Sequence, residues 1–387
     1  MGTIEGGGPA GGFGAFGGFG GFGGFGGFGG FGGFGPGGSP DAPLLASALI
    51  AAHDGIAGVF DPTQVPPEID ERPRETTAWL ERLSAPSRSA VFAMEIASRL
   101  AFGFDQATGR AAVWHAQTLP SDAAPSNPAY MRLATLSRPG MDVFRGQLAA
   151  IDSHADLRED RAPEILMQLG ALAEFLRPIA YLNPARTPWT LELLATAQAL
   201  AVLVEGRMKF ALACKRPVEL SPQIQPMVLT PTHGTLPSGH ATEAFALARV
   251  LRLLLLDAGT SPYDETLWSE MLMRAAARIA INRTVAGVHF PVDSVAGAAL
   301  GLTLGTYFAA RCRQETEAVQ MTLVGEMTEE ATAFDWSLLY DPATDAQTGA
   351  ASSLGDYVTV ADVSFDADTM ASGPLAWLWA KAKAEWA

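Results

Sequence analysis

Four long apolar segments follow one another in the second half of the chain, and they limit its fold more than any other feature. They lie at residues 187–216, 238–257, 264–282 and 291–313. Thr187 and Pro188 open the first by the N-cap and first-turn proline signature of a helix, and Pro217 stops it. Gly259 stands just beyond the second, where helices commonly end. The pattern predicts an all-α protein built around a helical bundle.

Weaker signals lie outside these four segments. Apolar residues recur with a helical period over residues 88–102, and residues 163–182 look helical with an interruption at Pro178. Residues 356–365 alternate weakly like a strand, and residues 374–386 favour a short amphipathic helix. These signals leave the all-α prediction in place.

The N-terminal segment is of low complexity, because Phe recurs at every third position of a Gly background within residues 6–38. Such a segment cannot repay the backbone entropy that glycine loses on folding. We predict a disordered tail over residues 1–40, a helical domain over 41–315, and an acidic extension over 316–387 that packs on the domain or is partly disordered. In the simpler interpretation the tail is a neutral extension. In the alternative, its Phe side chains make it a self-association or docking arm.

The formal net charge is -15, which restricts the kinds of partner. A protein that binds nucleic acid needs a basic face to replace counterions, so we expect no nucleic-acid partner. General attraction to anionic lipid is excluded for the same reason. An acidic protein that handles an anion must gather its few cations in one place. Cys214 and Cys312 form neither a metal-type pair nor a disulfide framework.

The sequence also predicts no transmembrane span. The most apolar stretch, at residues 295–310, is shorter than about 18 residues and rich in Gly and Thr, which favours a buried helix. The first residues have no basic and apolar regions of a secretory signal, so a soluble protein in the cytoplasm is favoured. A homo-oligomer is left open.

Lys209 and Arg216 form the first of three short motifs that carry chemistry. They are two helical turns apart, so a continuous helix would place them on one face, with Pro217 ending the helix beside Arg216. Two cations on one face repel each other unless an anion lies between them. An isolated pair of this kind is more often two solvated charges.

Pro237, Ser238, Gly239 and His240 form the second motif. Ser238 is the expected N-cap of a helix, and Gly239 lets a ligand approach the backbone closely. The free N–H groups of the first turn then face an anion, and His240 in the same turn can act as a general acid. Taken alone, the motif is equally well an ordinary capped helix with a surface histidine.

The third motif contains Arg283, His289 and Asp293. Gly287 and Pro291 interrupt the helical pattern, so the chain can turn and bring the Arg283 and His289 side chains to one point. Asp293, four residues after His289, can accept a hydrogen bond from one ring nitrogen. The other nitrogen is then left as a nucleophile or ligand. A surface pair at this spacing is the common alternative.

Together the three motifs supply complementary parts of one anion site, and they resemble the signature of the type 2 phosphatidic acid phosphatase superfamily. That superfamily also contains the vanadium haloperoxidases and bacterial acid phosphatases. Its signature is Lys, six residues, Arg-Pro; then Pro-Ser-Gly-His; then Ser-Arg, five residues, His, three residues, Asp. The parts lie here at residues 209–217, 237–240 and 282–293. Asn282 replaces the usual Ser, and the resemblance covers roughly residues 163–313.

The resemblance implies a helical bundle of the acid phosphatase and vanadium haloperoxidase type, and a role for each residue of the motifs. His289 is implied as the nucleophile that forms a phosphohistidine, or as the residue that ligates vanadate. His240 is implied as the acid and base, and Asp293 as the group that orients His289. The implied phosphate- or vanadate-binding residues are Lys209, Arg216, Ser238, Gly239 and Arg283. No divalent metal is implied.

Phosphate-ester hydrolysis, which needs no cofactor, is the leading prediction. Residues 287–293 resemble the third motif of the lipid-type phosphatases, and the interval between His240 and Arg283 is short. The alternative is a vanadium-dependent haloperoxidase that oxidises halide with hydrogen peroxide. Its supports are the size, the acidic character and the Thr-His step at His233, which is a candidate for the mouth of the site. A scaffold protein is not favoured, because no structural role requires all the motif residues.

Overall fold

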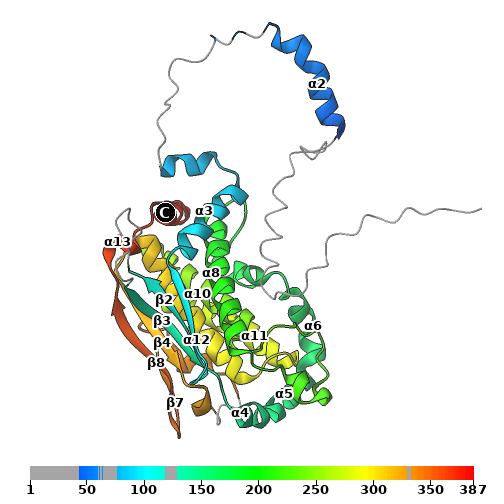
Figure 1. Ribbon diagram of the computed structural model, residues 1–387, viewed down its shortest axis with the longest axis vertical. Helices are drawn as coiled ribbons and strands as arrows, with labels where there is room; N and C mark the ends of the chain where they lie inside the picture. The colour runs from blue at the N-terminus through cyan, green and yellow to red at the C-terminus, as the bar shows by residue number, and fades with distance from the viewer. Residues whose placement is uncertain (1–42, 60, 62, 64–75, 118–128, 329–332) are drawn as a thin grey trace, which may run out of the picture.

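The computed structural model describes residues 43–59, 61, 63, 76–117, 129–328 and 333–387. The predicted disordered tail, residues 1–40, lies outside the described residues and stays a prediction. Within the described part, long helices form the centre and a sheet lies along one side of them (Figure 1).

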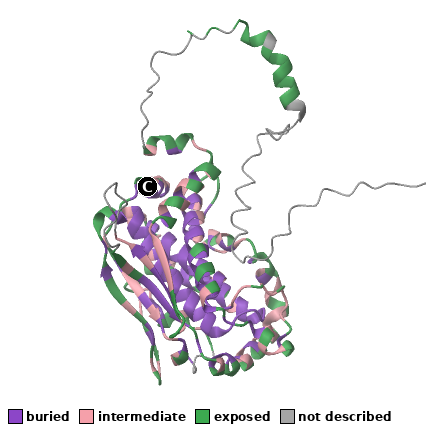
Figure 2. Ribbon diagram, viewed as in Figure 1, coloured by how far each residue is buried: buried purple, intermediate pink, exposed green. Residues whose placement is uncertain are grey.

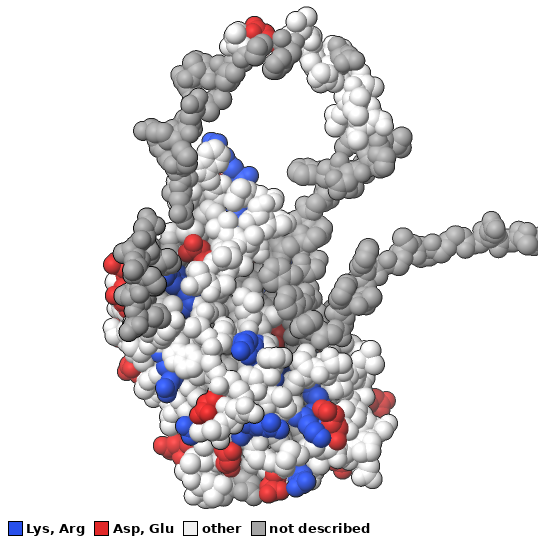
Figure 3. All heavy atoms as spheres, viewed as in Figure 1, with Lys and Arg blue, Asp and Glu red and all other residues white. Residues whose placement is uncertain are grey.

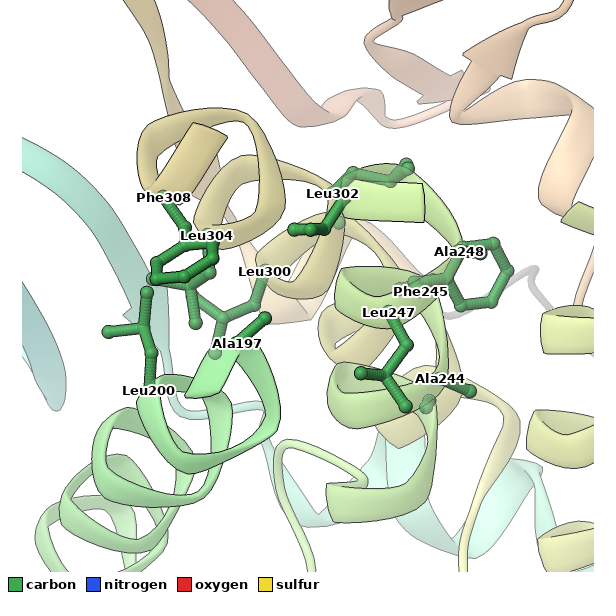
Figure 4. Packing of buried hydrophobic residues seen from close by; sticks show 14 of the residues in the cluster. Ala197, Leu200, Ala244, Phe245, Leu247, Ala248, Leu300, Leu302, Leu304 and Phe308 are labelled. Atoms are coloured by element: carbon green, nitrogen blue, oxygen red, sulfur yellow. The ribbon is translucent and has the colours of Figure 1, made fainter. Parts of the chain in front are cut away.

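Four helices make the core, as the apolar segments predict. They are α8 (Pro188–Leu212), α10 (Gly239–Ala258), α11 (Thr266–Val285) and α12 (Pro291–Arg313). In Figure 2 the buried residues, in purple, are concentrated in these central helices. Leu304 and Phe308 of α12 pack beside Leu200 of α8 in the same hydrophobic cluster (Figure 4).

The first helix is shorter than predicted. It ends at Leu212, because Ala213 adopts the left-handed conformation with φ 46°. The chain then continues to Arg216, the extended N-cap of α9 (Pro217–Leu220). Lys209 and Arg216 therefore do not share one helix face, and their approach depends on the turn between them.

The all-α prediction is wrong, because the protein also has a mixed six-stranded sheet in the order β1-β2-β3-β4-β8-β7. Its strands are β1 (Leu100–Asp105), β2 (Arg110–Ala116), β3 (Tyr130–Ser137), β4 (Glu317–Leu323), β7 (Ala350–Ser352) and β8 (Gly355–Ser364). Neighbouring strands are antiparallel except β3 and β4. A separate pair consists of β5 (Tyr340–Asp341) and β6 (Ala346–Gln347).

Part of the sheet was hidden inside a predicted helix. The segment 88–102 is helical only as α3 (Ala85–Ala97), and it is followed by β1. Leu100 fits the helical spacing that precedes it, but in the structure it pairs with His115 of β2. A short apolar run suits a helix or a strand by its spacing alone, and the partner strand decides between them.

The C-terminal segment completes the sheet begun by the N-terminal strands, because β4 pairs with β3 and β8 pairs with β4. The strand predicted at residues 356–365 is confirmed as β8, and the helix predicted at 374–386 is confirmed as α14 (Gly373–Ala384). The segment 163–182 is broken into α6 (Arg158–Met167), a 3-10 turn at Leu172–Phe175 and α7 (Arg177–Ala180).

Shorter helices complete the described fold. They are α2 (Pro43–Ala57), α4 (Met141–Gly146), α5 (Leu148–His154) and α13 (Ala367–Met370). Helix α6 lies against α11, which brings its C-terminal end toward the third motif.

Glycines on α12 allow its close contact with α10. A Cβ at Gly297 would lie 2.6 Å from the Ser238 carbonyl oxygen, and one at Gly305 would lie 2.8 Å from the Arg249 Cβ. Gly301, between them, faces the backbone of α10 at Thr242. Because these positions have no side chain, the two backbones pack tightly, which holds the N-terminal turn of α10 against the start of α12.

The prediction of no transmembrane span is also corrected. Helix α12 is long and apolar enough to cross a membrane by length and composition, although 94% of its most apolar window is buried inside the protein. The sequence criterion failed because it asked for an uninterrupted apolar run. The Gly and Thr residues of α12 shorten such a run but leave its mean hydropathy high.

Candidate active site

The second motif forms a capped helix start, as predicted. Ser238 is the N-cap of α10, and its hydroxyl accepts a hydrogen bond from the Ala241 amide at 3.5 Å. The Ser238 amide donates to the Asp293 carbonyl oxygen at 2.9 Å, which ties this turn to α12. The first N–H groups of a 20-residue helix, here α10, are aligned with its dipole and suit an anion.

Gly239 is enclosed by a neighbouring carboxyl group. A Cβ at this position would lie 2.5 Å from Glu205 Oε1 and 3.0 Å from Glu205 Cδ. Any larger residue at position 239 must therefore displace the Glu205 side chain, which is 2% exposed and belongs to α8.

We expect Gly239→Ala to lower stability by about 1–3 kcal/mol, because it overpacks this contact, and to weaken anion binding by shifting the turn. Thermal unfolding measures the effect on stability, and kcat/KM for the expected hydrolysis of phosphate esters measures the effect on the site. Gly206→Ala is the matched control, since a Cβ there meets nothing within 4 Å, and a helical Gly→Ala change should raise stability slightly. Wild-type stability and kcat/KM in Gly239→Ala would show that Glu205 moves aside freely.

The third motif brings His289 and Asp293 together at the start of α12. Asp293 Oδ2 lies 2.9 Å from His289 Nδ1 and accepts a hydrogen bond from the Phe290 amide at 2.9 Å. The same oxygen accepts a short hydrogen bond from the Thr235 hydroxyl. Because a carboxylate only accepts, Nδ1 of His289 carries a proton and Nε2 has the free electron pair. Gly287, with φ 79°, makes the turn that leads to this pair.

Burial sets the protonation of the two groups. Burial lowers the pKa of His289 well below its ordinary value, and the charges of Arg216 and Lys209 lower it further. The imidazole is therefore neutral near pH 7. Burial raises the pKa of Asp293 to about 6, while hydrogen bonds from Thr235 and the Phe290 amide oppose the rise. Asp293 is thus mainly ionised at neutral pH and can hold the Nδ1 proton of His289.

Arg216 points directly at the free nitrogen of His289. Its Nη1 lies 3.0 Å from His289 Nε2 and donates to the Val288 carbonyl at 2.9 Å. Its Nε donates to the His233 carbonyl at 3.1 Å, and its Nη2 lies 3.1 Å from His233 Nδ1. His233 therefore lies beside the site. Desolvation lowers the Arg216 pKa to about 10, so the guanidinium stays charged.

Lys209 approaches the same region from α8. It is 2% exposed, and its ammonium donates to the Pro237 carbonyl at 2.5 Å and to the Thr235 carbonyl at 3.4 Å. These carbonyls belong to the segment that leads into the second motif. Desolvation lowers the Lys209 pKa to about 8, and the nearby Glu205 charge opposes that shift.

Gln168, at the end of α6, contacts both Arg283 and His240, the two remaining residues of the predicted site. Its side-chain oxygen accepts from Arg283 Nη2 at 2.8 Å and from Asn282 Nδ2 at 3.1 Å. Its backbone carbonyl lies 3.0 Å from His240 Nε2. Arg283 is 1% exposed, and its Nε has no hydrogen-bond partner in the described part of the chain. A buried cation with an unused donor is suited to an anion.

The Gln168 carbonyl also determines the tautomer of His240. A carbonyl only accepts, so Nε2 of His240 carries the proton and Nδ1 is its titrating nitrogen. Burial lowers the pKa of His240 well below its ordinary value, and the Arg283 charge lowers it further. His240 is therefore neutral near pH 7 in this arrangement.

The structure thus brings all eight predicted residues into one buried hydrogen-bonded region. It contains Lys209, Arg216, Ser238, Gly239, His240, Arg283, His289 and Asp293. Sequence reasoning missed Gln168 and Thr235. Thr235 lies two residues before the second motif, so its place in the sequence was a usable signal. Gln168 is far from His240 along the chain, and no local sequence pattern indicates that the two meet. His115 lies elsewhere, bonded to Tyr307 and Thr369 in the core.

The surface shown in Figure 3 has acidic and basic side chains interspersed. The cations of the site do not contribute to such a surface, because Lys209, Arg216 and Arg283 are each at most 2% exposed. The protein therefore gathers three buried positive charges in an acidic chain, which is the concentration of cations that an anion site requires.

The comparison with known families agrees with the motifs and the helical core. Residues 190–316 match the model of the PAP2 superfamily. No curated protein matches the chain.

A solved structure that the chain resembles is a transmembrane PAP2-type phosphatidylglycerolphosphate phosphatase from Bacillus subtilis. The two sequences are 19% identical, the match covers 43% of this chain and 81% of that one, and the TM-score is 0.27. The match of residues 190–316 to the PAP2 superfamily supports phosphatase-type activity.

Proposed function

We propose that the protein hydrolyses phosphate monoesters through a phosphohistidine at His289. The observation that carries this proposal is the orientation of His289. Asp293 holds its protonated Nδ1 at 2.9 Å, and Nε2 points at the guanidinium of Arg216 at 3.0 Å. A neutral imidazole beside buried cations is suited to attack a phosphorus atom whose oxygens those cations bind.

The first step forms a bond between His289 Nε2 and phosphorus and breaks the bond between phosphorus and the ester oxygen. Protonated His240 gives its Nδ1 proton to the leaving oxygen, so the alcohol departs neutral. In the second step neutral His240 takes a proton from water, which attacks phosphorus and breaks the P–N bond. Inorganic phosphate leaves, and both histidines return to their starting state.

Arg216 must change partners when a substrate binds. Its Nη1 donates to Nε2 of His289, the atom that has to attack. A phosphate oxygen is a stronger acceptor for a guanidinium than a neutral imidazole nitrogen, because it carries negative charge and allows bidentate pairing. Substrate therefore draws Arg216 away and exposes the lone pair, so the nucleophile is freed only when its target is present.

The bound phosphate also prepares His240. Burial and the charge of Arg283 lower the pKa of His240 and so oppose its protonation. A dianionic ester beside it reverses the sign of the local field and favours the imidazolium that must act as the acid. Proton donation is thereby linked to substrate binding.

The same donor set fits vanadate, which the haloperoxidase alternative would need as its cofactor. His289 Nε2 would be its protein ligand, and Lys209, Arg216 and Arg283 would neutralise its charge. Vanadate would supply the activation of peroxide, while the protein would orient and charge-balance it. The Nε donor of Arg283, which has no partner among the described residues, suits phosphate and vanadate alike.

We expect vanadate to inhibit p-nitrophenyl phosphate hydrolysis competitively, because five-coordinate vanadate mimics the phosphoryl transition state. Steady-state rates at several substrate and vanadate concentrations measure the pattern. Bromide oxidation with peroxide is assayed in parallel. Halide oxidation without ester hydrolysis would replace the phosphatase proposal by the haloperoxidase one. Failure of vanadate to bind would reject both.

A further inference from the structure

Two glutamates lie buried between α8 and α10 and take no part in the proposed mechanism. Glu205 is 2% exposed and Glu243 is 1% exposed. Glutamates are almost never this buried unless an ion pair compensates them. Gln198 donates to Glu243 Oε2 at 2.6 Å. Glu205 Oε2 and Glu243 Oε1 have no hydrogen-bond partner within the described residues.

The Glu205 carboxyl group lies directly behind the anion-binding turn, and Glu243 lies on the helix that this turn begins. Glu205 is one helical turn before Lys209 on α8, and Glu243 is one turn after Gly239 on α10. Glu205 Oε1 is the atom that a Cβ at Gly239 would strike, at 2.5 Å. An anion held by the amides of this turn therefore has the Glu205 carboxyl group on its protein side, with Glu243 one turn further along α10.

The charges that face the two carboxyl groups come from several elements. Lys209 on α8 and Arg216 before α9 stabilise ionised Glu205, while the two glutamates oppose each other's ionisation. The charge of Lys209 also interacts with that of Asp293 on α12. His240 lies on α10, and its lowered pKa disfavours the charged imidazolium.

Two ionised carboxylates in this position lack the donors that would compensate them, so one proton between them is the favourable state. Burial, with the Glu243 charge second, raises the pKa of Glu205 well above its ordinary value. Burial raises the pKa of Glu243 to about 7. An anion that enters the site adds negative charge next to this pair and makes even a single ionised carboxylate less favourable there.

We propose that Glu205 and Glu243 together hold one proton beneath the anion site, and that anion binding draws a further proton from solvent onto the pair. The inference rests on the proposed phosphate site. One proton moves from water or buffer to a carboxylate oxygen as the dianion binds, and it returns when the anion leaves. The pair acts through its charge, so both glutamates are positioning residues. Substrate affinity then weakens as the pH rises through the titration of the pair.

The test is calorimetry of sulfate binding to the full chain at about pH 7, in buffers of different ionisation enthalpy. Sulfate is a tetrahedral dianion whose own charge is constant at this pH. We expect wild-type protein to take up about half to one proton per sulfate. Glu205→Gln and Glu243→Gln should each lose at least half of that uptake. In Glu205→Gln, sulfate should bind up to about tenfold more tightly at pH 8 than in the wild type.

Glu270→Gln, on α11 in a surface pair with Arg274, is the matched control and should keep the wild-type uptake. Uptake that survives in both buried variants would place the titrating group elsewhere, at His240 or Lys209 for example, and would overturn the inference. Sulfate binding without any uptake in the wild type would overturn it too, while the phosphate site would stand. No sulfate binding at all would reject the proposed function itself.

A second measurement does not depend on either variant folding. Infrared difference spectra of the wild type should gain a protonated-carboxyl band when sulfate is added. Absence of that gain would contradict the inference.

Discussion

Replacing His289 by alanine is expected to reduce phosphate-ester hydrolysis to the uncatalysed background, a loss on the order of a millionfold. The change removes the Nε2 atom that Arg216 faces at 3.0 Å and that Asp293 orients through Nδ1. No other group is proposed to form the covalent intermediate, so the whole pathway is lost. Single-turnover rates and trapping of the phosphoenzyme by an alkaline quench, in which a phosphohistidine is stable, measure the effect.

His154→Ala is the control for this experiment. That imidazole lies on α5 and bonds to the Ala150 carbonyl at 2.7 Å, so its loss should leave turnover unchanged. A phosphoenzyme that still forms in His289→Ala would assign the nucleophile to another residue. Binding of phosphate should survive in the variant, because Lys209, Arg216 and Arg283 remain.

Replacing His240 by alanine is expected to cost on the order of 100- to 10,000-fold in the rate of alkyl phosphate hydrolysis. The variant keeps the nucleophile but loses the proton donor for the leaving oxygen. Esters with good leaving groups need no acid, so the loss should shrink across a series of aryl phosphates of decreasing phenol pKa. The slope of log kcat/KM against leaving-group pKa measures the change.

An equal loss across that series would contradict the role of His240 in proton transfer to the leaving group. Gln168→Ala serves as a comparison, because it removes the side-chain contact to Arg283 while its backbone carbonyl can still hold His240. That variant should lose phosphate affinity and keep the wild-type dependence on the leaving group. The two variants therefore separate anion binding from proton transfer.

The proposed pair of Glu205 and Glu243 would make substrate affinity depend on pH, although neither residue takes part in the reaction. Burial raises the pKa of Glu243 to about 7, close to the range in which phosphate esters themselves ionise. A pH profile of kcat/KM alone would mix the two titrations. Sulfate binding, with a ligand of constant charge, isolates the contribution of the protein.

Local sequence determined the parts of this site that depend on near neighbours. Ser238 caps its own helix, and the spacing of His289 and Asp293 around Pro291 brings their side chains to hydrogen-bond distance. The four core helices were predictable for the same reason. Apolar spacing, caps and prolines act within one or two turns, so a single segment contains all the information they need.

Tertiary structure decided what depends on partners far away in the chain. Leu100 lies in a strand because it pairs with His115. Strand β3 pairs with β4, although the four core helices lie between them in the sequence. Arg216 reaches His289 only because Ala213 ends α8 early, which the spacing from Lys209 does not reveal.

The contacts of Gln168 and Glu205 with the second motif were likewise beyond the sequence. Gln168 meets His240 only after α6 packs on α11, and Glu205 meets Gly239 only after α8 packs on α10. Packing of helix on helix chooses such neighbours, and no periodicity within one segment encodes it. The eight residues of the motifs were therefore visible in the sequence, whereas the groups that set their charge and tautomers were chosen by the fold.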